Sequence, residues 1–232
     1  MEKQIFQDLN ISVITIDGGA GSGKSSTSEI LAKKTGFHHL DSGIYFRALG
    51  LKAARKGINF FNHGALVTMA ENLDIRIEKG TILLDGEECT EIIKSPNAGK
   101  LASMVSPIRL VREAFLPKQL SHRRLPGLVA NGRDMGEIFD TPMRFFLEVS
   151  PEERAKRKFD EIRKKSLNAD LKIILAEIIE RDRIDRIRTV SPLKPHPKAK
   201  IIRGNGKTAE EIAHRIFFHC VEHLPHSVVF KN

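Results

Sequence analysis

The chain has 232 residues, of which 41% are hydrophobic and 29% are charged. This length can bury a sizeable core, and the composition excludes collagen-like, disordered and disulfide-scaffold proteins. No apolar run approaches the roughly 18 residues that a membrane span needs, and the N-terminus lacks the pattern of a signal peptide. Cys89 and Cys220 show no metal-binding or redox spacing, so we expect two reduced thiols in a cytoplasmic protein.

The net charge of +9 comes from 38 basic and 29 acidic residues. Residues 144–203 contain 17 Lys or Arg and 10 Asp or Glu, which accounts for +7 of that total. A basic segment attracts phosphate groups, which nucleotides, nucleic acids and membrane surfaces all present. Composition alone does not choose among them, and a basic solvated surface gives the same count.

The first elements alternate between strands and helices. Residues 13–17 form a short apolar run that predicts a buried strand, and a glycine-rich turn follows over residues 18–23. The apolar spacing predicts a helix over 24–34, then a short strand that ends at Leu40 and a helix over about 43–55.

The middle of the chain has a different pattern. Polar and apolar residues alternate over 74–78, Lys79-Gly80 follows, and then comes the segment Thr81-Ile82-Leu83-Leu84-Asp85. This predicts a β-hairpin. A hairpin within a strand–helix alternation indicates an inserted subdomain, which we expect over residues 65–98.

The alternation then resumes. The patterns predict, in order, helical structure over 107–123, strands over 127–131 and 144–149, a helix capped by Ser150 and Glu153, a helix over 170–188, a strand over 199–203 and a helix capped by Thr208 and Glu211. Strands that alternate with helices predict an α/β fold with a parallel sheet covered by helices.

Residues 18–25 match the phosphate-binding loop G-x-x-x-x-G-K-[ST] in its strand–loop–helix context. Glycines let successive N–H groups face phosphate oxygens, and the start of the helix adds its positive dipole end. Lys24 is expected to reach the β- and γ-phosphates and Ser25 to bind Mg²⁺. Asp17 either orients Mg²⁺ through water or caps the turn. The predicted ATP-binding residues are Gly18, Gly19, Ala20, Gly21, Ser22, Gly23, Lys24, Ser25 and Ser26.

A phosphate-binding loop does not identify the substrate. The N-K-x-D motif of GTPases is absent, and the chain is short for a motor ATPase. Three clusters point instead to a kinase of small phosphates. Ser42 and Arg47 open the helix after the second strand, and Arg133 and Asp134 follow a buried strand, at whose carboxyl end ligands gather in open α/β sheets.

The third cluster is a pair of arginine-bearing helices, predicted as a mobile lid over residues 151–190. Helical spacing places several of their charged side chains on shared faces. The competing interpretation is a pair of solvated, salt-bridged helices, because Glu177–Arg181 and Asp182–Arg186 are also i,i+4 pairs. The lid side chains expected to face nucleotide are Arg154, Arg157, Arg181, Asp185 and Arg188.

From about Val13 to Phe217 the chain resembles bacterial cytidylate kinases. The matching motifs are residues 18–25, Asp41-Ser42-Gly43, residues 82–87, Val111-Arg112-Glu113, Leu125-Pro126-Gly127, residues 132–136 and Glu180-Arg181-Asp182. The resemblance implies transfer of the γ-phosphoryl group of ATP to CMP or dCMP with Mg²⁺. It also implies a core with the phosphate-binding loop over 1–64, a nucleotide-binding insertion over 65–98, core over 99–150, a helical lid over 151–190 and core over 191–232.

The resemblance assigns roles by position. The residues implied for CMP are Ser42, Arg47, Ser103, Arg112, Arg133, Asp134, Arg181, Asp185 and Arg188. Among them, Ser42, Ser103, Arg112 and Asp134 hold cytosine, Arg47 and Arg133 hold the acceptor phosphate, and the lid residues lie near the sugar, phosphate or base. The residues implied for catalysis are Lys24, Arg133, Arg154, Arg157 and Arg181.

Three positions depart from the family pattern. Phe46 stands where Tyr is usual, with Tyr45 one place earlier, so a ring face survives and the hydroxyl contact is either lost or displaced. Gly19 stands where Pro is common, which loosens the turn. Asn131 stands where an acidic residue is usual, which removes a negative charge near the metal.

Two alternatives remain at this point. One is a nucleoside monophosphate kinase with UMP or AMP as acceptor. The other is a nucleic-acid-binding ATPase that uses the basic half of the chain. The absence of Trp and the single Tyr leave few of the usual stacking platforms for bases, although 13 Phe remain. We therefore expect a monomer that binds ATP and CMP or dCMP, without specific nucleic acid and without a membrane.

Overall fold

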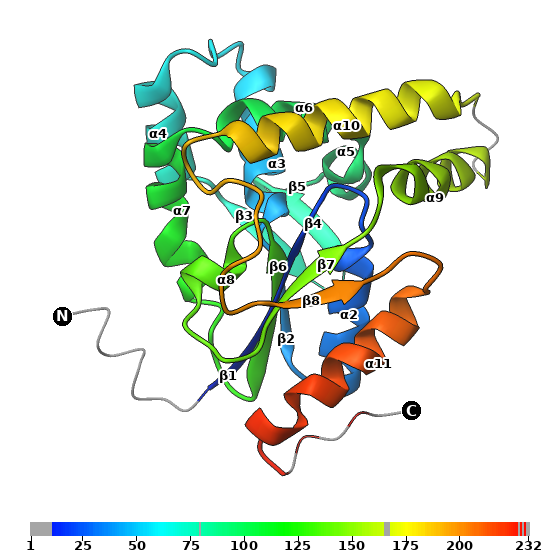
Figure 1. Ribbon diagram of the computed structural model, residues 1–232. Helices are drawn as coiled ribbons and strands as arrows, with labels where there is room; N and C mark the ends of the chain where they lie inside the picture. Colours follow the sequence, from blue (N-terminus) through cyan, green and yellow to red (C-terminus); the bar gives the residue numbers. More distant parts are fainter. Residues whose placement is uncertain (1–10, 79, 165–167, 227, 229, 231–232) are drawn as a thin grey trace. The chain divides into compact units, whose positions relative to one another are not determined.

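The computed structural model describes residues 11–78, 80–164, 168–226, 228 and 230 (Figure 1). The chain divides into two compact units. One consists of residues 1–40 and 122–232 and is called the core unit below; the other consists of residues 41–121 and is called the inserted unit. The inserted unit contains the whole predicted insertion over 65–98 and extends beyond it on both sides. The functional division into five segments stays a prediction.

The core unit is built on a five-stranded sheet in the order β2-β6-β1-β7-β8. These strands are β1 (Ser12–Gly18), β2 (His38–Asp41), β6 (Gly127–Gly132), β7 (Arg144–Glu148) and β8 (Lys200–Arg203). Strand β1 runs parallel to both β6 and β7, and β7 runs parallel to β8. Every residue of β6 is buried, as expected for a parallel strand covered on both faces. The predicted parallel sheet is confirmed.

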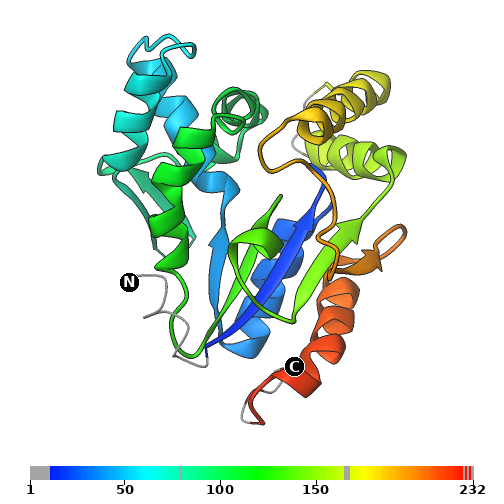
Figure 2. The same ribbon diagram turned by 60° about the vertical axis from the view of Figure 1, so that its left-hand side comes forward.

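Two helices pack together against this sheet, α2 (Lys24–Thr35) and α11 (Ala209–Cys220) (Figure 2). Their apolar side chains join those of the strands in one core, which includes Ile14, Ile16, Leu31, Phe145, Ile202, Ile212 and Ile216. The capping box that starts α11 is present, because Thr208 and Glu211 bond each other's backbone N–H groups. A short 3-10 helix over Val221–His223 follows α11.

A second pair of helices in the core unit, α9 (Pro151–Lys164) and α10 (Leu171–Ile187), forms a hairpin with its own small apolar core of Ala155, Ile174 and Ile178 (Figure 1). At the start of α9, Ser150 Oγ accepts the Glu153 N–H at 3.3 Å, which is half of the predicted capping box. Within the described part of the chain, no helix is both long and apolar enough to cross a bilayer.

The sheet register brings the candidate site together. Asp17 of β1 pairs with Gly132 of β6, and Gly18 pairs with Leu147 of β7. The three strands therefore end at one edge of the sheet. The segments that leave them are the glycine-rich loop, the turn into the short helix α8 (Met135–Ile138), and the start of α9.

The inserted unit has a three-stranded antiparallel sheet and five helices among its described residues. They are α3 (Gly43–Arg55), α4 (His63–Glu71), β3 (Ile75–Glu78), β4 (Thr81–Leu84), β5 (Glu87–Glu88), α5 (Thr90–Lys94), α6 (Pro96–Val105) and α7 (Arg109–Leu120). The predicted hairpin is confirmed, with Ile77 opposite Ile82. Helices α4, α5 and α6 were not predicted. They are short, although Ser95 as cap and Pro96 in the first turn mark the start of α6.

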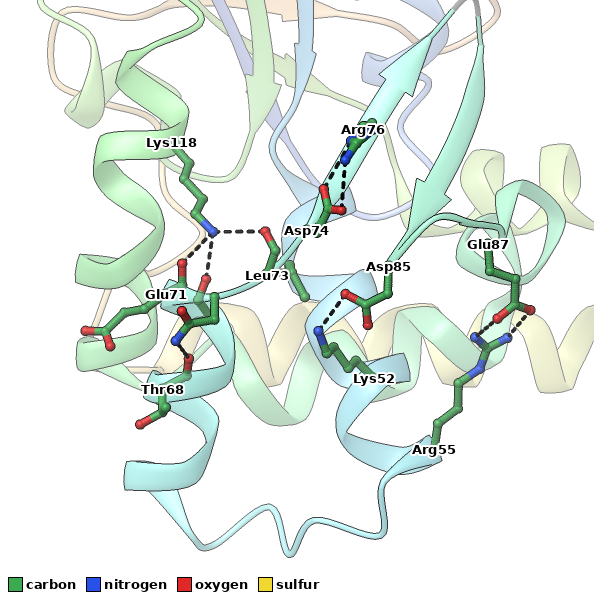
Figure 3. Close-up of polar contacts among 12 residues, drawn as sticks. Lys52, Arg55, Thr68, Glu71, Leu73, Asp74, Arg76, Asp85, Glu87 and Lys118 are labelled. Atoms are coloured by element: carbon green, nitrogen blue, oxygen red, sulfur yellow. Dashed lines mark hydrogen bonds and ion pairs between the residues drawn. The ribbon is translucent and has the colours of Figure 1, made fainter.

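Charged side chains tie the elements of the inserted unit to one another (Figure 3). The Lys118 ammonium of α7 donates to the carbonyl oxygens of Ala70, Glu71 and Leu73 at 2.9–3.0 Å, which closes the C-terminal end of α4. From α3, Lys52 pairs with Asp85 at 2.7 Å and Arg55 pairs with Glu87 at 2.8 Å. The helices that carry Arg47 and Arg112 are thereby attached to α4 and the hairpin.

Candidate active site

The predicted phosphate-binding loop has the expected local structure. It leaves β1 at Gly18 and enters α2 at Lys24. Gly21 and Gly23 have φ values of 70° and 89°, a left-handed conformation that side chains with a Cβ rarely adopt. These two glycines therefore allow the loop to turn at the start of the helix, where backbone N–H groups and the helix dipole favour an anion.

Four predicted catalytic cations lie on this loop, and each donates to one of its carbonyl oxygens. Arg133 Nη1 donates to Gly18 at 2.7 Å and Lys24 Nζ to Gly19 at 3.0 Å. Arg154 Nη1 donates to Ala20 at 3.0 Å and Arg157 Nη1 to Ser22 at 3.3 Å. They come from α2, α9 and the turn after β6, so the fold concentrates positive charge around the loop.

The four cations differ in how firmly they are held. Arg154 is 2% exposed, and its guanidinium makes a two-pronged ion pair with Asp182 of α10, at 3.0 and 2.6 Å. Sequence spacing pairs Asp182 with Arg186, and that interpretation is wrong, because Asp182 is buried against Arg154. Helices α9 and α10 are therefore joined by a buried ion pair.

Arg157 is more loosely held. Its side chain is 29% exposed, and its Nε donates to Glu153 at 3.0 Å. Its Nη2 donates to the carbonyl oxygens of Gly204 and Lys207, in the loop between β8 and α11. Arg157 thus links the phosphate-binding loop to the segment that begins α11.

A second ionic cluster joins the turn after β6 to the end of α10. Asp185 is 5% exposed and lies 2.7 Å from Arg133 Nη2 and 3.4 Å from Arg188 Nη1. The sequence predicts Arg188 within the helix over 170–188. Arg188 instead follows the last residue of α10 with extended backbone, and its Nε donates to the Ser191 carbonyl. Arg181 lies within α10 and is half-buried.

Asp17 has a role that neither sequence interpretation included. Its two carboxylate oxygens accept the N–H groups of Met135 and Gly136 at 2.9 and 2.8 Å, so it caps α8. Burial raises the pKa of Asp17 to about 7; the two N–H bonds oppose this shift, and the neighbouring Asp134 charge adds to it. Arg144 Nε donates to the Gly136 carbonyl, and together these contacts fix the turn that carries Arg133 and Asp134.

The described residues contain no group of three or more His, Cys, Asp or Glu side chains that could enclose a metal ion. Ser25 is exposed at the start of α2, so its hydroxyl is accessible. One exposed hydroxyl fits Mg²⁺ bound with a nucleotide, since that ion keeps several waters and uses substrate phosphates as ligands. The donor set therefore fits a nucleotide-borne Mg²⁺ and not a protein-enclosed one.

The other predicted CMP residues belong to the inserted unit. Arg47 Nη1 donates to the carbonyl oxygens of Ile93 and Ser95, and Arg112 Nη1 to that of Ser106. Ser103 donates to Gly99 on α6, and Ser42 is buried at the start of α3. The guanidinium of Arg112 lies 5.1 Å from the ring centre of Phe46, which packs edge-on against Phe115. The Phe46 ring therefore supports Arg112 without a hydroxyl.

Sequence reasoning missed several residues that organise the site. Asp182, Arg144 and His39 were absent from the predicted site. An aspartate in a helical charge run resembles a solvated residue, and only tertiary structure shows that Asp182 is buried. His39 bonds Asn131 at 2.9 Å, a contact between residues 92 positions apart that no local sequence pattern signals.

Comparison with known proteins supports the resemblance. Residues 14–221 match the family model described as Cytidylate kinase. The cytidylate kinase of Stutzerimonas stutzeri (strain A1501) is 40% identical over 214 residues, which cover 89% of this chain and 93% of that protein. That of Azotobacter vinelandii (strain DJ / ATCC BAA-1303) is 39% identical over 212 residues, covering 88% and 93%.

Among solved structures, shikimate kinase from Acinetobacter baumannii in complex with shikimate aligns over 95% of this chain and 97% of that one, with 16% identity and a TM-score of 0.42. So low a score supports no argument, and the fold class rests on the parallel sheet itself. The family model and the two relatives, in contrast, each match most of the sequence. They show that the chain belongs to the cytidylate kinase family.

Proposed function

We propose that the protein transfers the γ-phosphoryl group of ATP to CMP or dCMP and forms ADP with CDP or dCDP. The observation that carries this proposal is the concentration of Lys24, Arg133 and Arg157 on the phosphate-binding loop of a chain in this family. The relatives named above are cytidylate kinases.

The acceptor needs little activation. The nucleophile is an oxygen of the monophosphate, whose second pKa is about 6, so it is already mostly anionic at neutral pH. We therefore assign no general base. The difficulty is to bring two anions together in line, which positive side chains and positioning achieve.

ATP is held by the phosphate-binding loop. Its phosphates accept from the backbone N–H groups of residues 18–26, and Lys24 leaves the Gly19 carbonyl for the β- and γ-phosphates. The Ser25 hydroxyl would hold the Mg²⁺ that accompanies ATP, and that ion would supply neutralisation of the charge on the phosphates. A water-mediated contact from Asp17 is part of this proposal, although its two oxygens already accept backbone N–H groups.

CMP is held by the residues that the family resemblance assigns to it. Arg47 and Arg133 bind the acceptor phosphate, and Arg133 exchanges its partner Asp185 for that phosphate. Ser42, Ser103, Arg112 and Asp134 contact cytosine. The lid residues Arg181, Asp185 and Arg188 complete the site, and closure of the lid excludes water, the competing acceptor.

The test is a coupled assay of ADP formation with ATP, Mg²⁺ and one acceptor at a time: CMP, dCMP, UMP, AMP or none. We expect fast turnover with CMP and dCMP alone. Turnover with UMP or AMP instead would overturn the base contacts. ADP formation without acceptor, increased by DNA or RNA, would favour a nucleic-acid-dependent ATPase. We propose a monomer, since one chain supplies every assigned residue, and sedimentation in the same buffer tests this.

A further inference from the structure

The Ala20–Gly21 peptide lies in the middle of a tight turn of the phosphate-binding loop. The Ser22 N–H reaches the Gly19 carbonyl at 3.4 Å, and Gly21, the third residue of this turn, has a φ of 70°. That value belongs to a type II turn. Rotation of the central peptide converts such a turn to type I, which reverses the directions of its C=O and N–H groups.

Arg154 holds this central peptide by its carbonyl oxygen, at 3.0 Å from Nη1. In a trans peptide the C=O and the following N–H point in opposite directions, so this bond turns the Gly21 N–H away from Arg154. Phosphate-binding loops bind their ligand through backbone N–H groups. The contact therefore selects the peptide orientation that leaves an N–H available to the nucleotide.

The guanidinium of Arg154 is itself committed to the protein. Among the described residues, Nε donates to the Val149 carbonyl at 3.0 Å, and Nη1 and Nη2 donate to the two Asp182 oxygens. Together with the Ala20 bond, four of its five N–H groups are engaged. A move toward the phosphates would leave Asp182, which is 4% exposed, as a buried charge without its partner.

Gly19 fits this arrangement closely. A Cβ at this position would lie 2.9 Å from Arg154 Nη1 and 3.4 Å from Asp182 Oδ1. The ion pair thus lies directly against the loop backbone, in space that a side chain at residue 19 would fill. The side chains of Arg133 and Arg157 are 14% and 29% exposed, whereas that of Arg154 is 3% exposed.

We propose that Arg154 is a positioning residue, which with Asp182 clamps the Ala20–Gly21 peptide in its phosphate-binding orientation and does not touch the transferred phosphoryl group. This inference rests on the proposed function and replaces the catalytic role that the sequence implied for Arg154. It predicts that the clamp acts on any nucleotide with a β-phosphate, ADP and ATP alike.

The test is the dissociation constant of ADP, measured by calorimetry without acceptor or turnover, in Arg154→Lys, Asp182→Asn and the double variant. A lysine keeps the charge but has a single nitrogen in place of the fork. If the binding orientation then exists about one tenth of the time, the affinity for ADP falls about tenfold. We expect the affinity for ATP to fall by the same factor. The double variant should bind ADP as tightly as the single variant with the lower affinity, because the two substitutions disrupt the same contact.

Arg183→Lys is the matched control. Arg183 neighbours Asp182 on α10 and pairs with the exposed Glu180. The Arg183→Lys protein should therefore bind ADP with the affinity of the wild type. Thermal unfolding of each variant shows whether the fold is retained. Asp182→Asn serves if Arg154→Lys is unstable, because the amide oxygen of an asparagine at this position can still accept from the Arg154 guanidinium.

Two results would overturn the proposal. One is wild-type ADP affinity in Arg154→Lys with a large fall in kcat, which would place Arg154 on the transferred group. The other is unchanged or improved nucleotide affinity in Asp182→Asn. ADP binding involves no acceptor, so this test remains valid even if CMP is not the acceptor. If the wild-type protein binds no ADP, both the proposed function and the clamp are wrong.

Discussion

Asn131 is fully buried at the end of β6, and its amide joins three side chains from other segments. Its Oδ1 accepts from Ser28 at 2.6 Å and from His39 at 2.9 Å, and its Nδ2 donates to Ser25 at 3.2 Å. A neutral amide therefore contacts the hydroxyl proposed for Mg²⁺. The departure from the family pattern at this position removes a charge but keeps a hydrogen-bonded connection.

Asn131→Asp should strengthen metal binding. A carboxylate at this position can accept from all three neighbours and adds a negative charge close to the proposed ion. We expect the Mg²⁺ concentration for half-maximal activity to fall about tenfold. Titration of activity against free Mg²⁺ at fixed ATP measures this, with Asn131→Ala as the variant that loses the contacts without adding charge. An unchanged midpoint in Asn131→Asp would argue against Ser25 as the metal ligand.

Asp134→Ala should remove most of the discrimination between CMP and UMP. Asp134 can accept from the cytosine amine, whereas uracil would present a carbonyl to the same carboxylate. A polar site of this kind discriminates by about 10⁴ or more. The ratio of kcat/KM for the two acceptors measures the effect. Glu137→Ala, three residues further on α8 and exposed, should leave that ratio as it is. An unchanged ratio in Asp134→Ala would refute the assignment.

Asp17 predicts a pH-dependent stability. Its pKa of about 7 in the folded chain lies above the ordinary value of 3.8, so between these limits the folded state keeps a proton that the unfolded state has lost. The contribution of Asp17 to the free energy of unfolding is therefore fully present below pH 4 and is lost as the pH rises to 7. Relative to the wild type, Asp17→Asn should gain a few kcal/mol over that interval. Denaturant unfolding of both proteins at several pH values tests this. A difference between their free energies of unfolding that stays constant with pH would contradict it.

At the scale of elements, the inserted unit depends on ties between its helices and its hairpin. Lys118 of α7 donates to three carbonyl oxygens at the end of α4, while Lys52 and Arg55 of α3 reach Asp85 and Glu87 beside the hairpin (Figure 3). Exposed ion pairs such as Arg55–Glu87 are each worth about 0–1 kcal/mol. The Lys118 contacts matter more, because they satisfy carbonyl groups that the helix end leaves open.

Lys118→Met should therefore lower the free energy of unfolding by about 1–3 kcal/mol, since it leaves those carbonyl groups without their charged donor. Lys56→Met, also a lysine of the inserted unit but exposed, should change it by less than about 0.5 kcal/mol. Denaturant unfolding of both variants compares them. Equal effects would mean that the three carbonyl contacts contribute nothing specific.

At the scale of the whole molecule, each compact unit carries one cysteine. Cys89 belongs to the inserted unit and Cys220 to the core unit, and both are buried. Burial raises the pKa of the Cys220 thiol to about 12, so almost none of it is the reactive thiolate at pH 8. The two thiols therefore report on the two units separately.

We expect neither thiol to react with Ellman's reagent at pH 8 while the chain is folded. In the denatured chain, the thiols of both cysteines should react with the reagent. In Cys89→Ala and Cys220→Ala, the denaturant concentration at which the remaining thiol reacts measures the opening of one unit. Coincident midpoints indicate that the units unfold together. Rapid labelling of Cys220 in native buffer would contradict its burial in the core.

The sequence by itself determined the phosphate-binding loop, the parallel α/β pattern, the hairpin near Ile77 and Ile82, and the cap at Thr208. Each is set by neighbours a few residues apart, through glycine conformation, side-chain periodicity or a local hydrogen bond. The family resemblance grouped Lys24, Arg133, Arg154, Arg157 and Arg181, and in the structure the first four donate to carbonyl oxygens of one loop.

Only the tertiary structure decided what those charges bind. Asp182 meets Arg154, 28 positions away, and Asp17 meets the start of α8, more than 100 positions away. Spacing cannot rank such partners, because the free energy of a buried ion pair depends on how completely both groups leave water and on which other donors surround them. That is why a residue that the sequence placed among the catalytic groups is held, in the folded chain, as a clamp on the loop.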